Sequence, residues 1–149
     1  MENKNQILKI ASVILIVFAV ASFVISCINV FGSLGQFASD PAGQQALEQL
    51  EGSGVSAEQV MGIVNGTVYV VLAVSAIFTV LKVIVGILGI RKSELDGTGK
   101  FFQGWGIALL IFGILGLGST FSLIGICNLL AGIAAPLLYI IFGRKKMAA

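Results

Sequence analysis

The residue with the most chemical potential in this chain is a lysine inside a long apolar run. Lys82 stands nine positions before Arg91, which at ~1.5 Å rise per helical residue places it roughly 13 Å from the basic end of that run. A lysine near the middle of a bilayer costs about 2.5–3.5 kcal/mol, so such residues mark candidate functional sites. No Asp or Glu lies in any apolar run of the chain. The sequence therefore supplies no carboxylate for this ammonium group.

Three interpretations of Lys82 stay open at this point. Its side chain could extend to the cytoplasmic headgroups, helped by the hydroxyl of Tyr139. It could pair with an acidic residue or a lipid headgroup that a partner supplies. It could also belong to an anion or proton path, because an intramembrane charge often lies on such a path.

Two further pairs of residues are expected at matching depths near the outer membrane boundary. Cys27 and Cys127 could form a disulfide there if their helices touch, or they could remain small, free apolar residues. Asn29 and Asn128 could hydrogen-bond across a helix bundle, a contact worth roughly 0.6–2 kcal/mol in a membrane. The chain has no histidine and no acid–base set. The sequence thus predicts no enzyme, no cofactor and no metal site.

Four long apolar runs position these residues. Hydrophobic residues make up 57% of the 149 residues and charged residues 11%, whereas soluble domains carry about 25% charged residues. The runs cover about residues 10–30, 64–90, 101–117 and 121–142, and roughly 18 apolar residues suffice to cross a bilayer as a helix. Barrel strands would alternate instead. We expect an all-α integral membrane protein, a single four-helix bundle over residues 1–149.

The first apolar run has an alternative interpretation as a cleavable signal sequence. The basic start of the chain and this run resemble a secretory signal, and Val24–Cys27 fits a relaxed lipoprotein cleavage box. The run is longer than the 7–15 residues of a signal core, so we expect it to remain as a span.

The charged residues predict the orientation of the spans. Basic residues flank the runs at one side only, and they are Lys4, Lys9, Arg91, Lys92, Lys100, Arg144, Lys145 and Lys146. The segment 32–63 contains four acidic residues and no Lys or Arg. By the positive-inside rule both termini are cytoplasmic and this segment is an outer loop, in a protein of the plasma membrane. The basic clusters would contact membrane lipids, and no soluble domain is left to bind nucleic acid.

The outer loop is predicted to be helical. Asp40 with Pro41 is typical of an N-cap followed by proline in the first turn. Gly52–Gly54 should end that helix, and Ser56–Gln59 matches a capping box that begins a helix leading into the second span. Gly32–Gly35 is expected to be a flexible exit from the first span. The loop is either a solvated connector or a surface for an outside ligand.

Each span also carries a stripe of small or weakly polar residues, which predicts its packing face because helices in lipid associate through close backbone contact. The stripes are Ser12, Ala19, Ser22, Ser26 and Asn29; Ser75, Thr79, Lys82, Gly86 and Gly89; Gln103, Gly106, Gly113, Gly116 and Thr120; and Gly125, Asn128, Gly132, Ala135 and Tyr139.

Other features predict how the last two spans are shaped. A tight turn at Gly118–Ser122 should place the third and fourth spans together, and Pro136 should kink the fourth. The aromatic residues Phe101, Phe102, Trp105, Tyr139 and Phe142 are interpreted as an aromatic belt at the inner boundary.

Three glycine-rich segments follow one another in a characteristic order. They are GILGIRK at Gly86–Lys92, IFGILGLGS at Ile111–Ser119 and LLAGIAAPLLYIIFGRKK at Leu129–Lys146. Together with the basic start and the polar outer loop, this order resembles small four-span bacterial membrane proteins that are grouped as domains of unknown function. The resemblance implies a fold and no activity. The chain lacks the loop signature of claudins, the cysteine-rich loop of tetraspanins and the embedded glutamate of small multidrug exporters.

The function that these features favour is that of a non-enzymatic accessory, structural or regulatory membrane protein. It would pack against itself or against another membrane protein through the small-residue stripes, with Lys82 and the outer loop giving specificity. The alternative is a small transporter or channel subunit in which Lys82 contacts an anion or proton path. A carboxylate-free polar stripe would line a poor conduit.

Overall fold

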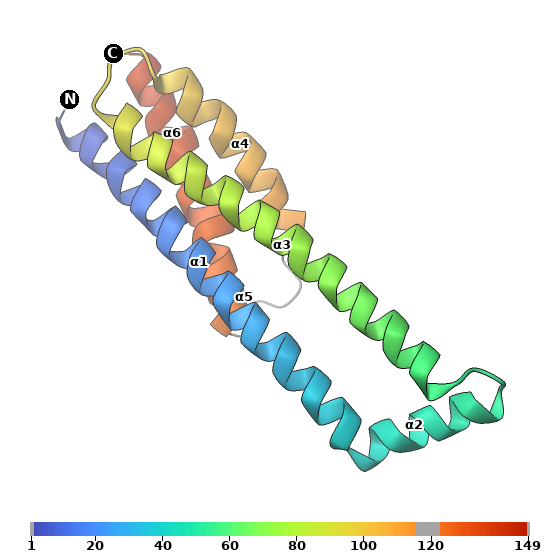
Figure 1. Ribbon diagram of the computed structural model, residues 1–149. Coiled ribbons are helices and arrows are strands. Elements are labelled where there is room, and N and C mark those ends of the chain that lie inside the picture. Colours follow the sequence, from blue (N-terminus) through green and yellow to red (C-terminus); the bar gives the residue numbers. More distant parts are fainter. Residues whose placement is uncertain (1, 116–122, 149) are drawn as a thin grey trace. The chain divides into compact units, whose positions relative to one another are not determined.

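The computed structural model describes residues 2–115 and 123–148, and these residues form helices connected by short turns (Figure 1). The elements are α1 (Glu2–Ser39), α2 (Pro41–Gly52), α3 (Ala57–Ser93), α4 (Gly99–Leu115), α5 (Leu123–Leu129), the π-helical turn η1 (Leu130–Ala134) and α6 (Ala135–Met147). The all-α class is confirmed. The predicted turn at Gly118–Ser122 and the stripe residues Gly116 and Thr120 lie outside the described residues.

Three of the helical stretches are long and apolar enough to cross a membrane, namely Asn5–Ser33, Ala57–Ser93 and Gly125–Met147. A shorter apolar helix covers Gly99–Ile114. Their length and composition make the chain a multi-pass integral membrane protein.

The first span does not end where the sequence predicted. Helix α1 continues through Gly32 and Gly35 to Ser39, so the expected flexible exit at Gly32–Gly35 is wrong. A glycine costs a helix only about 0.5–1 kcal/mol, and hydrogen bonds continue the helix past both glycines. The N–H of Asp40, for example, donates to the carbonyl oxygen of Gln36 at 2.8 Å.

The chain packs as two compact units. The core unit comprises residues 1–23 and 78–149, and the hairpin unit comprises residues 24–77. The expected single domain over residues 1–149 stays a prediction.

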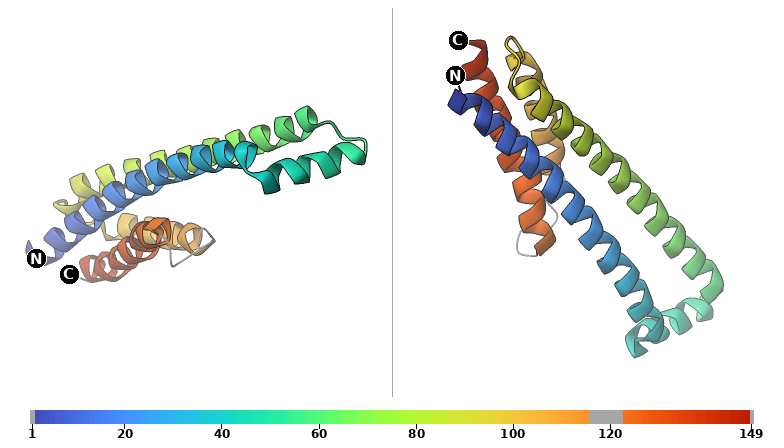
Figure 2. Two further views of the ribbon diagram at one scale, coloured as in Figure 1. Left: turned by 90° about the horizontal axis from the view of Figure 1, so that it is seen from below. Right: turned by 60° about the vertical axis from the view of Figure 1, so that its left-hand side comes forward.

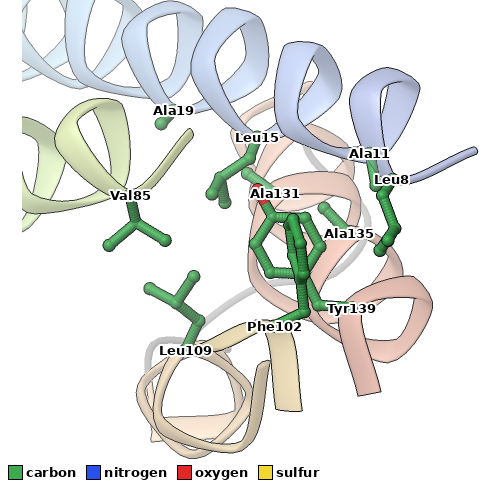
Figure 3. Packing of buried hydrophobic residues seen from close by; sticks show 10 residues of the cluster. All are labelled: Leu8, Ala11, Leu15, Ala19, Val85, Phe102, Leu109, Ala131, Ala135 and Tyr139. Atoms are coloured by element: carbon green, nitrogen blue, oxygen red, sulfur yellow. The ribbon is translucent and has the colours of Figure 1, made fainter. Parts of the chain in front are cut away.

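In the core unit the beginning of α1, the end of α3, α4 and α6 lie side by side, with both termini at the same end (Figures 1 and 2). Its buried apolar residues meet between these helices, and those shown in Figure 3 are Leu8, Ala11, Leu15, Ala19, Val85, Phe102, Leu109, Ala131, Ala135 and Tyr139. The stripe residues Ser12, Ala19, Gly86 and Gly89 are buried here, which confirms the predicted packing faces for this part of α1 and α3.

Glycines bring α4 and α6 into backbone contact. A Cβ atom added at Gly113 would meet the carbonyl oxygen and carbon of Gly132, and one added at Gly106 would meet the carbonyl oxygen of Pro136 at 2.9 Å. At the other end of the same seam, a Cβ at Gly143 would lie 3.0 Å from the carbonyl oxygen of Gly99. The predicted association of the third and fourth apolar segments through small residues is confirmed.

The irregular turn at Pro136 follows from its missing N–H group. Proline cannot donate to the carbonyl of the residue four before it, here Gly132. The helix widens to a π-helical turn over Leu130–Ala134, in which the N–H of Ala135 donates to the carbonyl oxygen of Leu130. The freed carbonyl of Gly132 is the group that faces Gly113.

The hairpin unit consists of the second half of α1, α2 and the first half of α3. The predicted caps are confirmed: Asp40 Oδ1 accepts from the N–H of Ala42 at 3.1 Å, and Pro41 occupies the first turn of α2. Ser56 Oγ and the N–H of Gln59 lie 3.3 Å apart, and the side chain of Gln59 accepts from the N–H of Ser56 at 3.3 Å. The segment between the first two spans is therefore helical, as expected.

Lys146 joins three helices at the basic end of the core unit. Its Nζ donates to the carbonyl oxygen of Ser93 at 2.5 Å, to that of Lys92 at 3.5 Å and to Asn5 Oδ1 at 3.1 Å. The two carbonyls belong to the last turn of α3, where a helix presents negative partial charge and unpaired acceptors. The ammonium group therefore caps α3 from α6.

Replacing Lys146 by methionine should destabilise the core unit by about 1 kcal/mol, because it removes the cap of α3 and the link to α1. Thermal unfolding of the purified protein in detergent measures this. The control is Lys100→Met, which removes an exposed ammonium at the same end of the unit. Equal losses in both variants would mean that the cap contributes nothing beyond net charge.

Candidate functional site

A hydrogen-bonded polar pair lies in the interior of the core unit. Ser12 of α1 and Tyr139 of α6 are both fully buried, and their oxygens lie 2.6 Å apart. Ser12 Oγ also donates to the carbonyl oxygen of Leu8 at 2.8 Å. A serine hydroxyl has one hydrogen, so Tyr139 donates to Ser12 and Ser12 donates to Leu8.

Neighbouring side chains hold the tyrosine ring in place. Phe102 is fully buried and packs edge-on against Tyr139, with ring centroids 5.1 Å apart and an interplanar angle of 79° (Figure 3). Phe102 and Tyr139 were expected in an aromatic belt at the membrane boundary, and for these two residues that interpretation is wrong. Both fill the core because α4 and α6 turn them toward α1.

Gly89 of α3 completes this site. A Cβ atom at Gly89 would meet both Tyr139 Oη and Ser12 Oγ, and one at Gly86 would meet the side chain of Ile16. Only glycine leaves room for the polar pair beneath α3. The site thus joins α1, α3 and α6 around a buried hydrogen bond.

Lys82 lies on the same face of α3 as these glycines. Lys82, Gly86, Gly89 and Ser93 follow one another at intervals of four, three and four residues, which is the repeat of one helix face. The exposed residues of this stretch, Val80, Ile84 and Ile87, occupy the opposite face. Lys82 is half-buried and faces the interior of the core unit, away from the lipid-facing surface.

The lysine does not have the partner that was suggested for it. Within the described residues no hydrogen bond joins Lys82 to Tyr139, whose hydroxyl is directed to Ser12 instead. Lys82 likewise forms no hydrogen bond or ion pair with any other described residue.

Ser22 is a buried polar residue of this unit without a partner in the part of the chain that the structure describes. It is 7% exposed, and its Oγ is the one buried side-chain oxygen or nitrogen atom within residues 2–115 and 123–148 that has no hydrogen bond. Serines in helices commonly donate to the carbonyl four residues earlier, as Ser12 and Ser33 do in α1. Ser22 makes no such bond, so its hydroxyl is free to bind something else.

The other predicted residues are not brought into this site. Asn128 is half-buried in the core unit, whereas Asn29 is exposed in the hairpin unit. Cys127 is buried in the core unit and Cys27 is half-buried in the hairpin unit. The asparagine contact and the disulfide stay predictions. Among the described residues no group of His, Cys, Asp or Glu is placed to hold a metal ion.

The hairpin unit has a rigid corner where α2 turns into α3. We define the α2–α3 corner as Leu50–Gln59. The N–H of Val55 donates to the carbonyl oxygen of Leu50 at 3.2 Å, and Glu51 Oε1 accepts from the N–H of Ala57 at 3.3 Å. Gly54 takes a positive φ of 90°, as such a sharp turn requires. The apolar side chains of Leu50 and Val55 are 40% and 37% exposed on this corner.

Comparisons of the chain with protein families, with curated proteins and with solved structures gave no match. The resemblance to small four-span bacterial membrane proteins therefore stays an expectation.

Sequence reasoning missed the roles of four residues in these sites. Ser12 and Ser22 were placed on a packing stripe, but nothing in their spacing distinguishes a bonded serine from an unbonded one. Lys146 was counted with the orientation-determining charges, and its partner Asn5 lies 141 positions away. The burial of Phe102 could have been predicted, because this residue lies three positions after Gly99 and four before Gly106. All three share the face of α4 that packs against α6.

Proposed function

We propose that this protein is a non-enzymatic accessory subunit that binds another membrane protein through its α2–α3 corner. The observation that carries the proposal is the exposure of Leu50 and Val55 on a corner whose backbone is fixed by hydrogen bonds. A preformed surface loses little conformational freedom on binding. Apolar side chains at the centre of a polar rim are typical of binding hot spots.

The charge around this corner suggests the partner's chemistry. Glu48, Glu51 and Glu58 are exposed near Leu50 and Val55, and the segment 32–63 has no basic residue. Complementary charges steer association and exclude wrong partners. We therefore propose a partner domain with an apolar pocket that basic side chains surround.

We propose the following membrane arrangement. α4 serves as a fourth span beside the three longer helices, because its glycine seam follows α6 from Gly99 to Gly113. Both termini lie in the cytoplasm, since Lys9, Arg91, Lys100 and Lys146 share one end of the core unit with them. The membrane would be the plasma membrane, with the acidic segment 32–63 on its outer side.

The lengths of α1 and α3 support this arrangement. The helices have 38 and 37 residues, and at ~1.5 Å per residue each is roughly 55 Å long, whereas the hydrocarbon core is about 30 Å thick. Each helix is therefore longer than the hydrocarbon core is thick, so part of each helix lies outside the apolar region of the membrane. The α2–α3 corner would then be accessible to a partner outside the membrane.

The test is purification from native membranes in mild detergent, followed by native mass spectrometry. The double variant Leu50→Lys/Val55→Lys should lose a partner subunit that the wild type retains at fixed stoichiometry. Gln45→Lys is the matched control, since it adds a lysine at an exposed position of α2 away from the corner. A wild type without a stoichiometric partner, or a double variant that still holds it, would contradict the proposal.

The alternative function is a small transporter or channel subunit, and one observation favours it. Lys82 faces the interior of the core unit and not the lipid surface. Flux in liposomes separates the two functions, because Lys82→Met should abolish transport but should not affect binding at the α2–α3 corner.

A further inference from the structure

Lys82 and the buried Ser22 have no hydrogen-bond partner among the described residues of the core unit, and the geometry of α1 and α3 brings them to similar depth. Gly86 lies beside Ile16 and the carbonyl oxygen of Ser12, which fixes how the antiparallel helices are aligned. Lys82 is four residues before Gly86, and Ser22 is six residues after Ile16. Measured from this contact, their Cα atoms differ in depth by two residues, which at ~1.5 Å per residue is about half a helical turn.

The directions of the two side chains reduce this difference further. Every Cα–Cβ bond in an α-helix tilts toward the N-terminus of that helix. Because α1 and α3 are antiparallel, the lysine stem and the serine hydroxyl incline toward a common level. Ser22 lies on the face of α1 that buries Ala19, three residues before it, and Lys82 lies on the face of α3 that buries Gly86 and Gly89.

The chemistry of the two groups determines what could bind between them. An ammonium group offers three donors and a hydroxyl offers one, so together they present donors and positive charge. No apolar run of the chain contains a carboxylate, and a second copy of the same chain would bring only another lysine. Self-association therefore cannot neutralise Lys82.

We propose that Lys82 and Ser22 form a binding site for a small inorganic anion in the interior of the core unit. A lipid headgroup is disfavoured as the source of negative charge, because Lys82 lies opposite the lipid-facing Val80, Ile84 and Ile87. Apolar side chains surround the site, so the best ligands are weakly hydrated monovalent anions such as nitrate or chloride, which lose water at low cost. The bound anion supplies the missing counter-charge and accepts the hydrogen of Ser22.

This inference is independent of the α2–α3 corner. It predicts that Leu50→Lys/Val55→Lys leaves the response to anions unchanged, so either proposal can fail alone.

The experiment uses the full chain in nanodiscs of neutral lipid and measures thermal unfolding in sodium gluconate, chloride and nitrate at equal ionic strength. At an anion concentration about tenfold above Kd, the wild type should unfold roughly 3 °C higher in nitrate or chloride than in gluconate. Lys82→Met should abolish this difference, Ser22→Ala should reduce it, and Lys82→Arg should retain part of it. Lys100→Met, which removes an exposed charge, should respond like the wild type.

Because each variant is compared with itself in two salts, a change in its basal stability does not obscure the result. No difference between salts in the wild type would overturn the site, as would a difference that persists in Lys82→Met. A Lys82-dependent shift that requires anionic lipid and occurs in gluconate would assign the position to a lipid headgroup and would also overturn it.

Discussion

Replacing Gly113 by alanine should destabilise the core unit by about 3 kcal/mol, although it adds a single methyl group. The new Cβ atom would overlap the carbonyl group of Gly132, which is backbone and cannot rotate away as a side chain does. Overpacking a close contact costs typically 1–3 kcal/mol, and a backbone-to-backbone clash lies at the upper end of that range. The helices α4 and α6 would have to separate along the whole seam.

Gly104→Ala provides the matched control for this prediction. Gly104 is in the same helix, but a Cβ atom there would meet nothing within 4 Å. Alanine is favoured over glycine in a helix by about 0.5–1 kcal/mol, so this variant should be as stable as the wild type or slightly more so. Thermal unfolding and the yield of folded protein in detergent compare the two. Similar stability of both variants would show that α4 and α6 do not touch at Gly113.

The close contact of Gly113 with Gly132 shows why part of the fold could be predicted from the sequence. The pattern of small residues predicted the packing faces, because close backbone approach in lipid requires Gly, Ala or Ser. The caps of α2 and α3 were predictable as well, since Asp40 and Ser56 act through neighbours two and three residues away. Such local rules depend on a few adjacent residues and little else.

Other features depend on contacts that the sequence does not encode locally. Gly32 and Gly35 suggested that the first helix ends there. Hydrogen bonds along the whole of α1 decide whether the helix continues, and it does. Phe102 and Tyr139 have the composition of a membrane belt, and only the rotation of α4 and α6 turns them inward. Lys82 was recognisable as exceptional, yet its inward direction follows from the alignment of α3 with α1.

Tyr139→Ala should be the most damaging single substitution in the core unit, at about 3–5 kcal/mol. Truncating a fully buried aromatic side chain removes its packing against Phe102 and leaves a cavity between α1, α4 and α6. The more informative comparison concerns the hydroxyl group alone, because the buried hydrogen bond to Ser12 has a defined direction.

Removing the donor of that hydrogen bond should destabilise the core unit less than removing its acceptor does. Tyr139→Phe deletes the donor, and Ser12 remains bonded to the carbonyl of Leu8, so the cost should be about 0.6 kcal/mol. Ser12→Ala deletes the acceptor and leaves the tyrosine hydroxyl buried without a partner beneath Gly89, which costs about 1–3 kcal/mol.

A double-mutant cycle of unfolding free energies measures this asymmetry. Ser12→Ala should be rescued when Tyr139→Phe is added, because the unpaired hydroxyl is then gone. Equal costs for the two single variants, without rescue in the double variant, would mean that Tyr139 and Ser12 are not bonded in this direction. The core unit would then be held together by apolar packing and glycine contacts alone.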